Sequence, residues 1–183
     1  MSDQRRLRPW RILSSEYRIQ TPFLRLRADR VELPSGHVVD DYFVRESNGF
    51  CVVFAVTADG NVVLVRQYKH GVGEIVVELP AGMIEPGEPP EVCAARELAE
   101  ETGFAGTIEH IRTFVADPTN STSRMHLFVA RDAERIATPD PDVTEEIEVM
   151  LVPRTEVRAM ALDGRIAASP QVAAILVALE ALR

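Results

Sequence analysis

The chain has 183 residues, of which 46% are hydrophobic and 26% charged, and its formal net charge at pH 7 is −8. This length suits one globular domain with a small additional part, and the acidic excess argues against general nucleic-acid binding, which needs a basic surface. The sequence contains neither a signal peptide nor an apolar run of membrane-spanning length, and two cysteines, Cys51 and Cys93, do not make a disulfide framework. We therefore expect a cytoplasmic protein with no membrane partner.

The N-terminal residues differ from the rest of the chain. A basic segment, RRLRPWRILSSEY, surrounds Trp10 and is interpreted as a solvated terminus. Residues 24–44 alternate apolar and charged on both sides of a Pro-Ser-Gly turn, which predicts a hairpin of half-buried strands. Because so small a sheet is marginally stable alone, we expect it to pack on the main domain or on another copy of the chain.

The central and C-terminal residues predict strands around a single acidic helix. Residues 50–57 form a continuous apolar run typical of a strand buried on both faces, and Asp59-Gly60 is a hairpin turn. Further strands are expected at 62–67, 74–79, 108–115, 125–130 and 147–152, loops at 68–73, 117–123 and 138–146, and helices at 155–162 and 170–182. This order indicates an α+β fold or an α/β/α layer arrangement.

The acidic helix follows a proline-glycine loop in the segment GMIEPGEPPEVCAARELAEETGF, residues 82–104. Pro89 and Pro90 suit the first turn of a helix, and Gly103 suits the left-handed residue that ends it. At 100° per residue, one face is expected to be apolar, with Val92, Ala95, Leu98, Ala99 and Thr102, and the opposite face to be acidic, with Glu97, Glu100 and Glu101. Acidic helix faces are commonly only solvated, but three carboxylates after a tight loop also suit a hard divalent cation, Mg²⁺ or Mn²⁺.

The whole segment matches the pattern G-x5-E-x7-R-E-U-x-E-E-x-G-U, in which U is aliphatic or aromatic. The matching residues are Gly82, Glu88, Arg96, Glu97, Leu98, Glu100, Glu101, Gly103 and Phe104. At ordinary residue usage, a chance match is on the order of one in a billion per starting position. The chain therefore resembles the Nudix hydrolases. This resemblance implies an α/β/α sandwich and the Mg²⁺- or Mn²⁺-dependent hydrolysis of a nucleoside diphosphate linked to another group.

Other segments resemble the ADP-ribose and nucleotide-sugar pyrophosphatase branch of that family. Residues 63–82 resemble its R-Q-Y-R strand and E-L-P-A-G lead, and Pro118 lies near its marker proline. The N-terminal hairpin resembles the extra sheet of its domain-swapped dimers, which implies a homodimer with residues 1–46 for dimerisation and 47–183 for hydrolysis. Two departures, Lys69 in place of arginine and the Thr-Asn-Ser-Thr-Ser loop after Pro118, put ADP-ribose itself in doubt more than the reaction.

The resemblance also implies roles for individual residues. The expected metal ligands are Ala81 through its carbonyl, Glu97, Glu100 and Glu101. Arg96 is expected to orient a glutamate, Glu88 to have a structural or water-mediated role, and Glu145 to act as general base, although Glu146 could serve instead. The expected substrate contacts are Trp10, Arg45, Arg66 and Lys69. For Trp10, stacking on the base and a packing role both remain open.

We therefore expect a metal-dependent pyrophosphatase that converts ADP-ribose or a related nucleoside diphosphate sugar into a nucleoside monophosphate and a sugar phosphate. The alternatives are hydrolysis of GDP-mannose, NADH or a dinucleoside polyphosphate, and a sensor that binds ADP-ribose without cleaving it. Such sensors commonly lose signature glutamates, and all of them are present here. The four histidines show no ligand spacing with the cysteines, so no zinc site is expected.

Overall fold

The computed structural model describes residues 7–142 and 144–183, which form two compact units. The smaller unit comprises the described residues up to Ser47 together with Asp117–Ser123. The larger unit comprises Asn48–Ala116 and Arg124–Arg183. Within this described part of the chain, no helix is both long enough and apolar enough to cross a membrane.

The smaller unit is a three-stranded antiparallel sheet in the order β1-β2-β3. The strands are β1 (Arg11–Gln20), β2 (Arg25–Glu32) and β3 (Val38–Glu46). The hairpin predicted for 24–44 is confirmed as β2 and β3. The basic segment interpreted as a solvated terminus has exposed side chains, as expected, but from Arg11 onward it forms a strand paired with β2, which was not predicted. Almost every β1 side chain is exposed, so the strand carries no apolar alternation that the sequence could reveal.

The loop at 117–123 belongs to the smaller unit, although it lies in sequence between two strands of the larger one. The backbone N–H of Arg45 donates to the Asn120 carbonyl at 2.8 Å, and the N–H of Thr122 donates to the Arg45 carbonyl at 3.0 Å. The Tyr42 hydroxyl donates to the Thr119 carbonyl at 2.6 Å. The loop therefore continues the backbone pairing at the end of β3.

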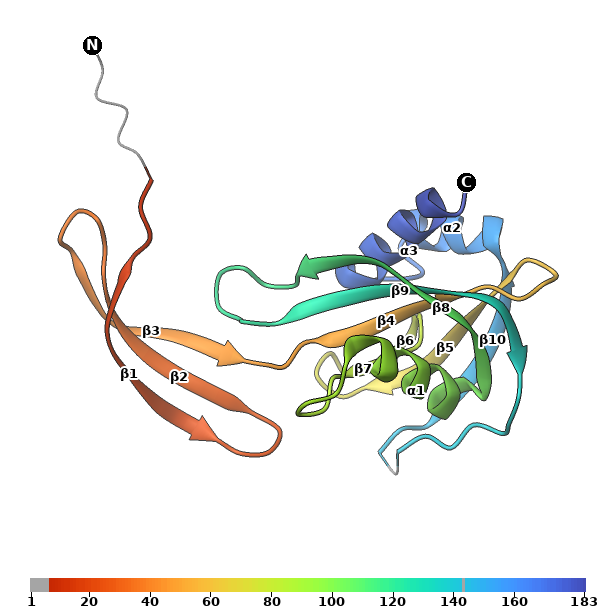
Figure 1. Ribbon diagram of the computed structural model, residues 1–183, viewed down its shortest axis with the longest axis horizontal. Coiled ribbons are helices and arrows are strands. Elements are labelled where there is room, and N and C mark those ends of the chain that lie inside the picture. The colour runs from red at the N-terminus through yellow and green to blue at the C-terminus, as the bar shows by residue number, and fades with distance from the viewer. Residues whose placement is uncertain (1–6, 143) are drawn as a thin grey trace, which may run out of the picture. The chain divides into compact units, whose positions relative to one another are not determined.

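The larger unit contains two sheets and three helices (Figure 1). Its strands are β4 (Phe50–Ala55), β5 (Asn61–Lys69), β6 (Glu74–Glu78), β7 (Ala81–Met83), β8 (Phe104–Val115), β9 (Arg124–Arg135) and β10 (Ile147–Pro153). One sheet has the antiparallel order β10-β5-β6, and the other has the order β7-β4-β9-β8, with β4 and β9 parallel. Strands were predicted at all of these places except β7. The strand β5 is longer than predicted, so Lys69 lies at a strand end paired with Glu74 rather than in a loop.

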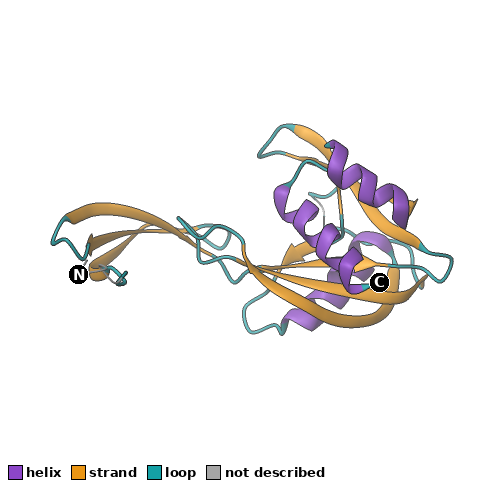
Figure 2. Cartoon of the chain, turned by 90° about the horizontal axis from the view of Figure 1, so that it is seen from above, coloured by secondary structure: helices purple, strands orange, loops and turns teal. Residues whose placement is uncertain are grey.

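The helices cover both sides of the sheets. The helix α1 (Pro90–Thr102) lies on one side, and α2 (Arg154–Asp163) and α3 (Ser169–Ala181) lie on the other (Figures 1 and 2). Alternate β4 side chains enter two different cores: Phe54 packs in the core of α2 and α3, whereas Val53 packs in the core of α1, and both are fully buried. The α+β fold with α/β/α layers is thus confirmed, and the continuous apolar run is explained by burial on both faces.

The helix α1 begins and ends as predicted, but its predicted faces are partly wrong. Its buried residues are Cys93, Ala94, Leu98, Glu101 and Thr102, whereas Val92 and Ala95 are exposed. The helix contacts β7 as well as β4 and β8. These strands together bury a wider part of its surface than one sheet face would. Glu101 consequently lies inside the protein, 1% exposed, instead of on a solvated acidic face.

Candidate active site

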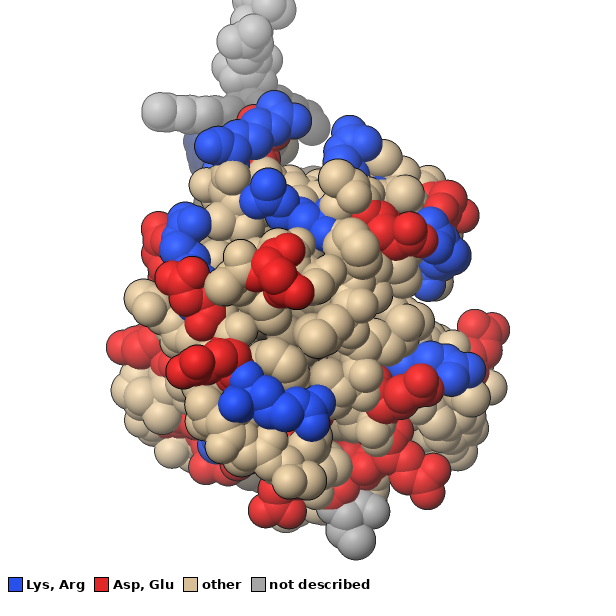
Figure 3. Space-filling view, turned by 90° about the vertical axis from the view of Figure 1, so that its right-hand side faces the viewer, with Lys and Arg blue, Asp and Glu red and all other residues tan. Residues whose placement is uncertain are grey.

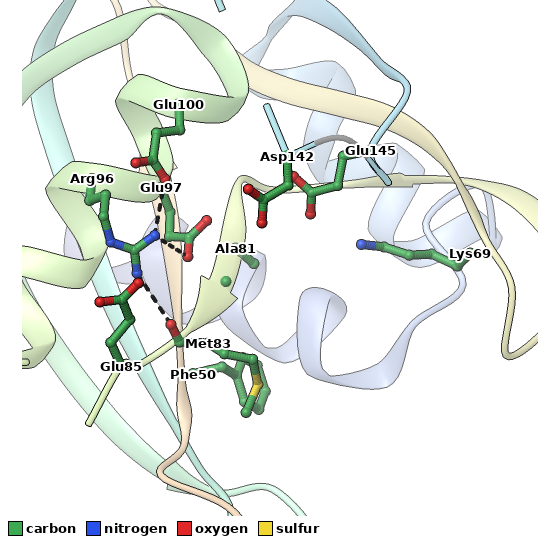
Figure 4. Close-up of a pocket in the computed structure, with 11 residues that line it drawn as sticks. Phe50, Lys69, Ala81, Met83, Glu85, Arg96, Glu97, Glu100, Asp142 and Glu145 are labelled. Carbon is green, nitrogen blue, oxygen red and sulfur yellow. Dashed lines mark hydrogen bonds and ion pairs between the residues drawn. The ribbon is translucent and has the colours of Figure 1, made fainter. Parts of the chain in front are cut away.

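A pocket of about 460 Å³ lies within the larger unit, between α1, β7 and the loop that precedes β10 (Figure 4). It is lined by Phe50, Lys69, Ala81, Gly82, Met83, Glu85, Arg96, Glu97, Glu100, Asp142 and Glu145. Six of the residues proposed from the sequence therefore meet at one place, from segments up to 76 positions apart. These are Lys69, Ala81, Arg96, Glu97, Glu100 and Glu145.

The short strand β7 brings the backbone of the pocket close to α1. Ala81 is paired with Val52 of β4, and Gly82 follows it directly beneath the helix. A Cβ atom at Gly82 would overlap the side-chain carboxylate of Glu97. Glycine at this position therefore leaves room for the Glu97 carboxylate over β7.

Arg96 connects the carboxylates of the signature segment. Its Nε donates to Glu88 Oε1 at 2.9 Å, and its Nη1 donates to Glu97 Oε1 at 2.8 Å and to Glu100 Oε2 at 3.0 Å. Its Nη2 donates to the Met83 carbonyl at 3.2 Å. The Arg96 hydrogen bond holds the pKa of Glu88 below its usual value, and the same pairing raises the pKa of Arg96. The guanidinium therefore fixes three carboxylates relative to β7.

Glu101 is the most buried of these carboxylates and is not among the described pocket-lining residues. Its Oε2 accepts the backbone N–H of Ala81 at 3.0 Å, while its Oε1 is buried and has no hydrogen-bond partner among the described residues. Burial raises the pKa of Glu101 to about 8. The hydrogen bond from the Ala81 N–H lowers this pKa, whereas the negative charges of Glu145 and Glu97 raise it further. Burial also raises the pKa of Glu97, although Arg96 opposes it.

These residues fit a divalent cation, although they are not already arranged around one. Among the described residues, no three His, Cys, Asp or Glu side chains form a group ready to hold a metal ion. A buried carboxylate oxygen without a partner is the donor that a cation would satisfy, and carboxylate and carbonyl oxygens are what hard cations prefer.

The opposite side of the pocket carries Lys69, Asp142 and Glu145. In Figure 4 all three side chains point toward the space beside Ala81. The Lys69 amine lies 3.7 Å from a carboxylate oxygen of Glu78, and the backbone N–H of Glu145 donates to the Asp142 carbonyl at 2.8 Å. The described residues that line the pocket include Glu145 but not the exposed Glu146.

Acidic side chains outnumber basic ones around the pocket. Five of its lining residues are Asp or Glu and two are Lys or Arg. By comparison, the face of the molecule shown in Figure 3 carries both Asp or Glu and Lys or Arg side chains, mixed over its surface. A phosphorylated ligand would therefore be repelled from the pocket unless a bound cation offset the carboxylates.

The remaining proposed residues lie elsewhere. Arg66 is on the same strand as Lys69, where it forms an ion pair with Glu148 at 2.8 Å, and it is not among the pocket-lining residues that the structure describes. Trp10 and Arg45 lie in the smaller unit, and the Trp10 ring packs edge-on against Tyr42 with centroids 5.5 Å apart.

Sequence reasoning did not single out Phe50, Met83, Glu85 or Asp142 as site residues, yet all four line the pocket. Met83 and Glu85 fall inside the signature segment, and Asp142 falls in the acidic loop next to Glu145. The positions of these three residues in the sequence could have identified them as candidates for the site. Phe50 begins an otherwise buried apolar run and carried no such signal.

Comparisons with known proteins show the family to which the chain belongs. The NUDIX domain model matches residues 47–174, more than half of the chain, and the model of a nucleoside diphosphate sugar hydrolase N-terminal domain matches residues 10–44. A methanol dehydrogenase activator from Bacillus methanolicus is 38% identical over 109 residues, which are 59% of this chain and 58% of that protein. An ADP-ribose pyrophosphatase from Mycobacterium tuberculosis is 32% identical over 167 residues, which are 90% of this chain and 80% of that protein.

A solved structure shows the same fold. The crystal structure of an ADP compounds hydrolase superposes with a TM-score of 0.83 at 23% sequence identity, over 97% of this chain and 96% of that one. The resemblance inferred from the signature segment is thus confirmed by the fold and by two family models. The chain belongs to the Nudix family, whose members generally use divalent cations.

Proposed function

We propose that the protein hydrolyses the pyrophosphate bond of ADP-ribose or a related nucleoside diphosphate sugar, giving a nucleoside monophosphate and a sugar phosphate. The observation that carries this proposal is the meeting of Glu97 and Glu100 with Ala81, Lys69 and Glu145 around one pocket, with Glu101 bonded to the Ala81 N–H. The names of the Mycobacterium relative and of the N-terminal family model support the substrate class.

In this proposal the cation is Mg²⁺ or Mn²⁺, held by Glu97, Glu100, Glu101 and the Ala81 carbonyl. A bound divalent cation offsets charge on phosphoryl oxygens and lowers the pKa of bound water. Arg96 would hold the carboxylates of Glu97 and Glu100 in position through the bonds it already makes.

Glu145 and Lys69, on the side of the pocket opposite α1, would activate the water and bind the substrate. Glu145 would accept the proton of the attacking water as general base. Lys69 would bind a phosphate or the terminal ribose as a point charge, without the planar fork by which an arginine grips two oxygens. Trp10, Arg45 and Arg66 stay candidates for substrate contacts.

The proposal includes a homodimer formed through the N-terminal sheet, by a domain swap, and a cytoplasmic location. Exposed apolar side chains in the smaller unit support the dimer, since they would be covered by a second copy. They include Trp10, Ile12, Tyr17, Ile19 and Phe43, each at least 41% exposed. Two free cysteines, Cys51 and Cys93, support the location.

The function is tested by incubating the purified protein with Mg²⁺ or Mn²⁺ and a panel of ADP-ribose, ADP-glucose, GDP-mannose, NADH, a dinucleoside polyphosphate and dATP. We expect a nucleoside monophosphate and a sugar phosphate from at least one nucleotide sugar, and loss of the product when EDTA removes the metal. Product identity by chromatography with phosphorus NMR separates the members of the panel.

Each alternative has its own outcome. Preferential cleavage of dATP would contradict the nucleotide-sugar assignment, and preferential cleavage of NADH or of the dinucleoside polyphosphate would narrow it to the dinucleotide alternatives. Binding of ADP-ribose without any product would support the sensor instead of the enzyme.

A further inference from the structure

The chain passes from one sheet to the other at Leu79 and Pro80, between β6 and β7. Two neighbours hold the second half of this passage. The Pro80 carbonyl accepts the backbone N–H of Val53 at 2.9 Å, and the Ala81 N–H donates to Glu101 at 3.0 Å. Leu79 lies just beyond the last paired residue of β6, Glu78, and its side chain is fully buried. Its backbone groups therefore need partners other than water.

Gln171 of α3 supplies these partners. Its Oε1 accepts the Leu79 N–H at 3.0 Å, and its Nε2 makes a longer contact of 3.5 Å with the Leu79 carbonyl. Gln171 is 5% exposed, in the core between α3 and the sheets, although glutamine is usually exposed. The side-chain amide thus takes the place of a strand partner for a residue 92 positions earlier in the sequence.

We propose that Gln171 is a positioning residue for the candidate active site, acting through Leu79 and Pro80 on the Ala81 backbone that meets Glu101. This inference rests on the proposed function, because it assigns the Ala81 carbonyl and Glu101 to one cation. With the Leu79 peptide fixed by Gln171, the carbonyl of Ala81 keeps its place opposite the carboxylates of α1. The helix α3, which supplies none of the pocket-lining residues described above, acquires a role in that pocket.

The test compares Gln171→Met with Ala178→Gly. The methionine keeps the length and burial of the side chain and removes both contacts to Leu79. Ala178 is fully buried on the same helix, about two turns away, and glycine there weakens α3 without touching Leu79. Two readouts are measured on each variant: backbone amide hydrogen exchange by NMR, and Mn²⁺ affinity in the absence of substrate.

We expect the Ala81 amide to exchange at least ~10-fold faster in Gln171→Met, relative to the change in global stability, and Mn²⁺ affinity to fall about 10-fold, because an unpaired Leu79 N–H frees the adjoining backbone. In Ala178→Gly, the Ala81 exchange rate and the Mn²⁺ affinity should change only as far as the loss of global stability accounts for. An unchanged Ala81 exchange rate in Gln171→Met, or equal effects in the two variants, would overturn the proposal.

A second variant covers the case in which Gln171→Met does not fold. Gln171→Glu keeps an acceptor for the Leu79 N–H and puts an acidic oxygen, in place of the Nε2 donor, beside the Leu79 carbonyl at this buried position. A rise in Ala81 exchange is therefore expected, and no rise would contradict the role. The exchange measurement needs neither metal nor substrate. If the wild-type protein cleaves nothing in the panel while Ala81 exchange still depends on Gln171, the proposed function fails and the positioning of the backbone stands.

Discussion

Glu145 and Glu146 are neighbours in the sequence, but they differ in their surroundings. Glu145 is half-buried and lines the pocket, whereas Glu146 is exposed. We expect Glu145→Gln to reduce turnover at least ~10²-fold with little change in substrate affinity, since the amide cannot accept the proton of the attacking water. Steady-state kinetics and calorimetric binding measure the two quantities.

The matched control for this variant is Glu146→Gln, which removes the adjacent charge from the same loop. Turnover close to that of the wild type is expected for it. Near-wild-type turnover in Glu145→Gln would remove Glu145 from the mechanism, and a large loss in Glu146→Gln alone would move the base to its neighbour.

Glu101 makes the stability of the metal-free protein depend on pH. Its folded-state pKa of about 8 lies above the ordinary glutamate pKa of 4.5, because burial disfavours the charged form. The folded state therefore binds more protons than the unfolded state between these values, so the free energy of unfolding falls as pH rises from about 4.5 to 8 and then levels off. A buried carboxylate with one oxygen unpaired is thus a source of instability at neutral pH.

Glu101→Gln removes this charge and keeps an acceptor for the Ala81 N–H. At pH 8 without metal, we expect the variant to be more stable than the wild type by at least about 1 kcal/mol, and the difference to vanish near pH 4.5. Urea unfolding at the two pH values measures it. Added Mg²⁺ should stabilise the wild type and have little effect on the variant; a variant that is less stable at pH 8 would contradict the argument.

At the scale of single residues, spacing alone predicted which side chains lie together on α1, whereas their roles stay predictions. Arg96, Glu97 and Glu100 are neighbours on one helix, so their arrangement follows from helical geometry. Phe50 and Asp142 come from segments far from that helix, and only the folding of the whole unit brings them to the pocket. The burial of Glu101 was likewise not predictable, because it depends on β7 covering the helix.

The contact between β7 and α1 leaves no room for a side chain at Gly82. Alanine there would place its Cβ on the Glu97 carboxylate and force that side chain away from its position over Gly82. We expect Gly82→Ala to fold with a loss of stability of about 1–3 kcal/mol, as overpacking usually gives, and to lose at least ~10-fold in metal affinity. Thermal unfolding and a Mn²⁺ titration measure these effects.

Gly71→Ala is the matched control, because a Cβ at Gly71 meets no atom within 4 Å. Metal affinity in this control should equal that of the wild type. Wild-type affinity in Gly82→Ala would show that the Glu97 carboxylate does not need its position over β7.

At the scale of elements, the sequence predicts features that depend on local residues, such as helix ends, but not features that depend on long-range packing, such as buried faces. The ends of α1 follow from Pro90 and from Gly103, whose φ of 72° closes the helix, so both ends were predicted. The buried face of α1 depends on which strands cover it, and the prediction of that face failed at Val92 and Ala95. The strand β1 has no apolar period, since its role is backbone pairing with β2.

At the scale of the whole molecule, the described pocket-lining residues and the exposed apolar side chains of the N-terminal sheet belong to different units. Every residue that lines the pocket belongs to the larger unit, whereas Ile12 and Ile19 expose their side chains in the smaller one. Apolar side chains exposed on this sheet would be removed from water by a second copy of the chain, which favours a dimer. We expect sedimentation velocity to show a dimer at micromolar concentration, and a folded monomer there would contradict the proposed assembly.

A paired substitution tests which unit carries the dimer. Ile12→Lys with Ile19→Lys puts charges on β1, which would be costly to bury at an interface. We expect this double variant to sediment as a monomer while its Mn²⁺ affinity without substrate stays within about 2-fold of wild type, because the carboxylates and the Ala81 carbonyl lie wholly in the larger unit. A dimer that survives both lysines would move the interface away from β1. Loss of metal affinity together with dimerisation would show that the cation site depends on the assembly.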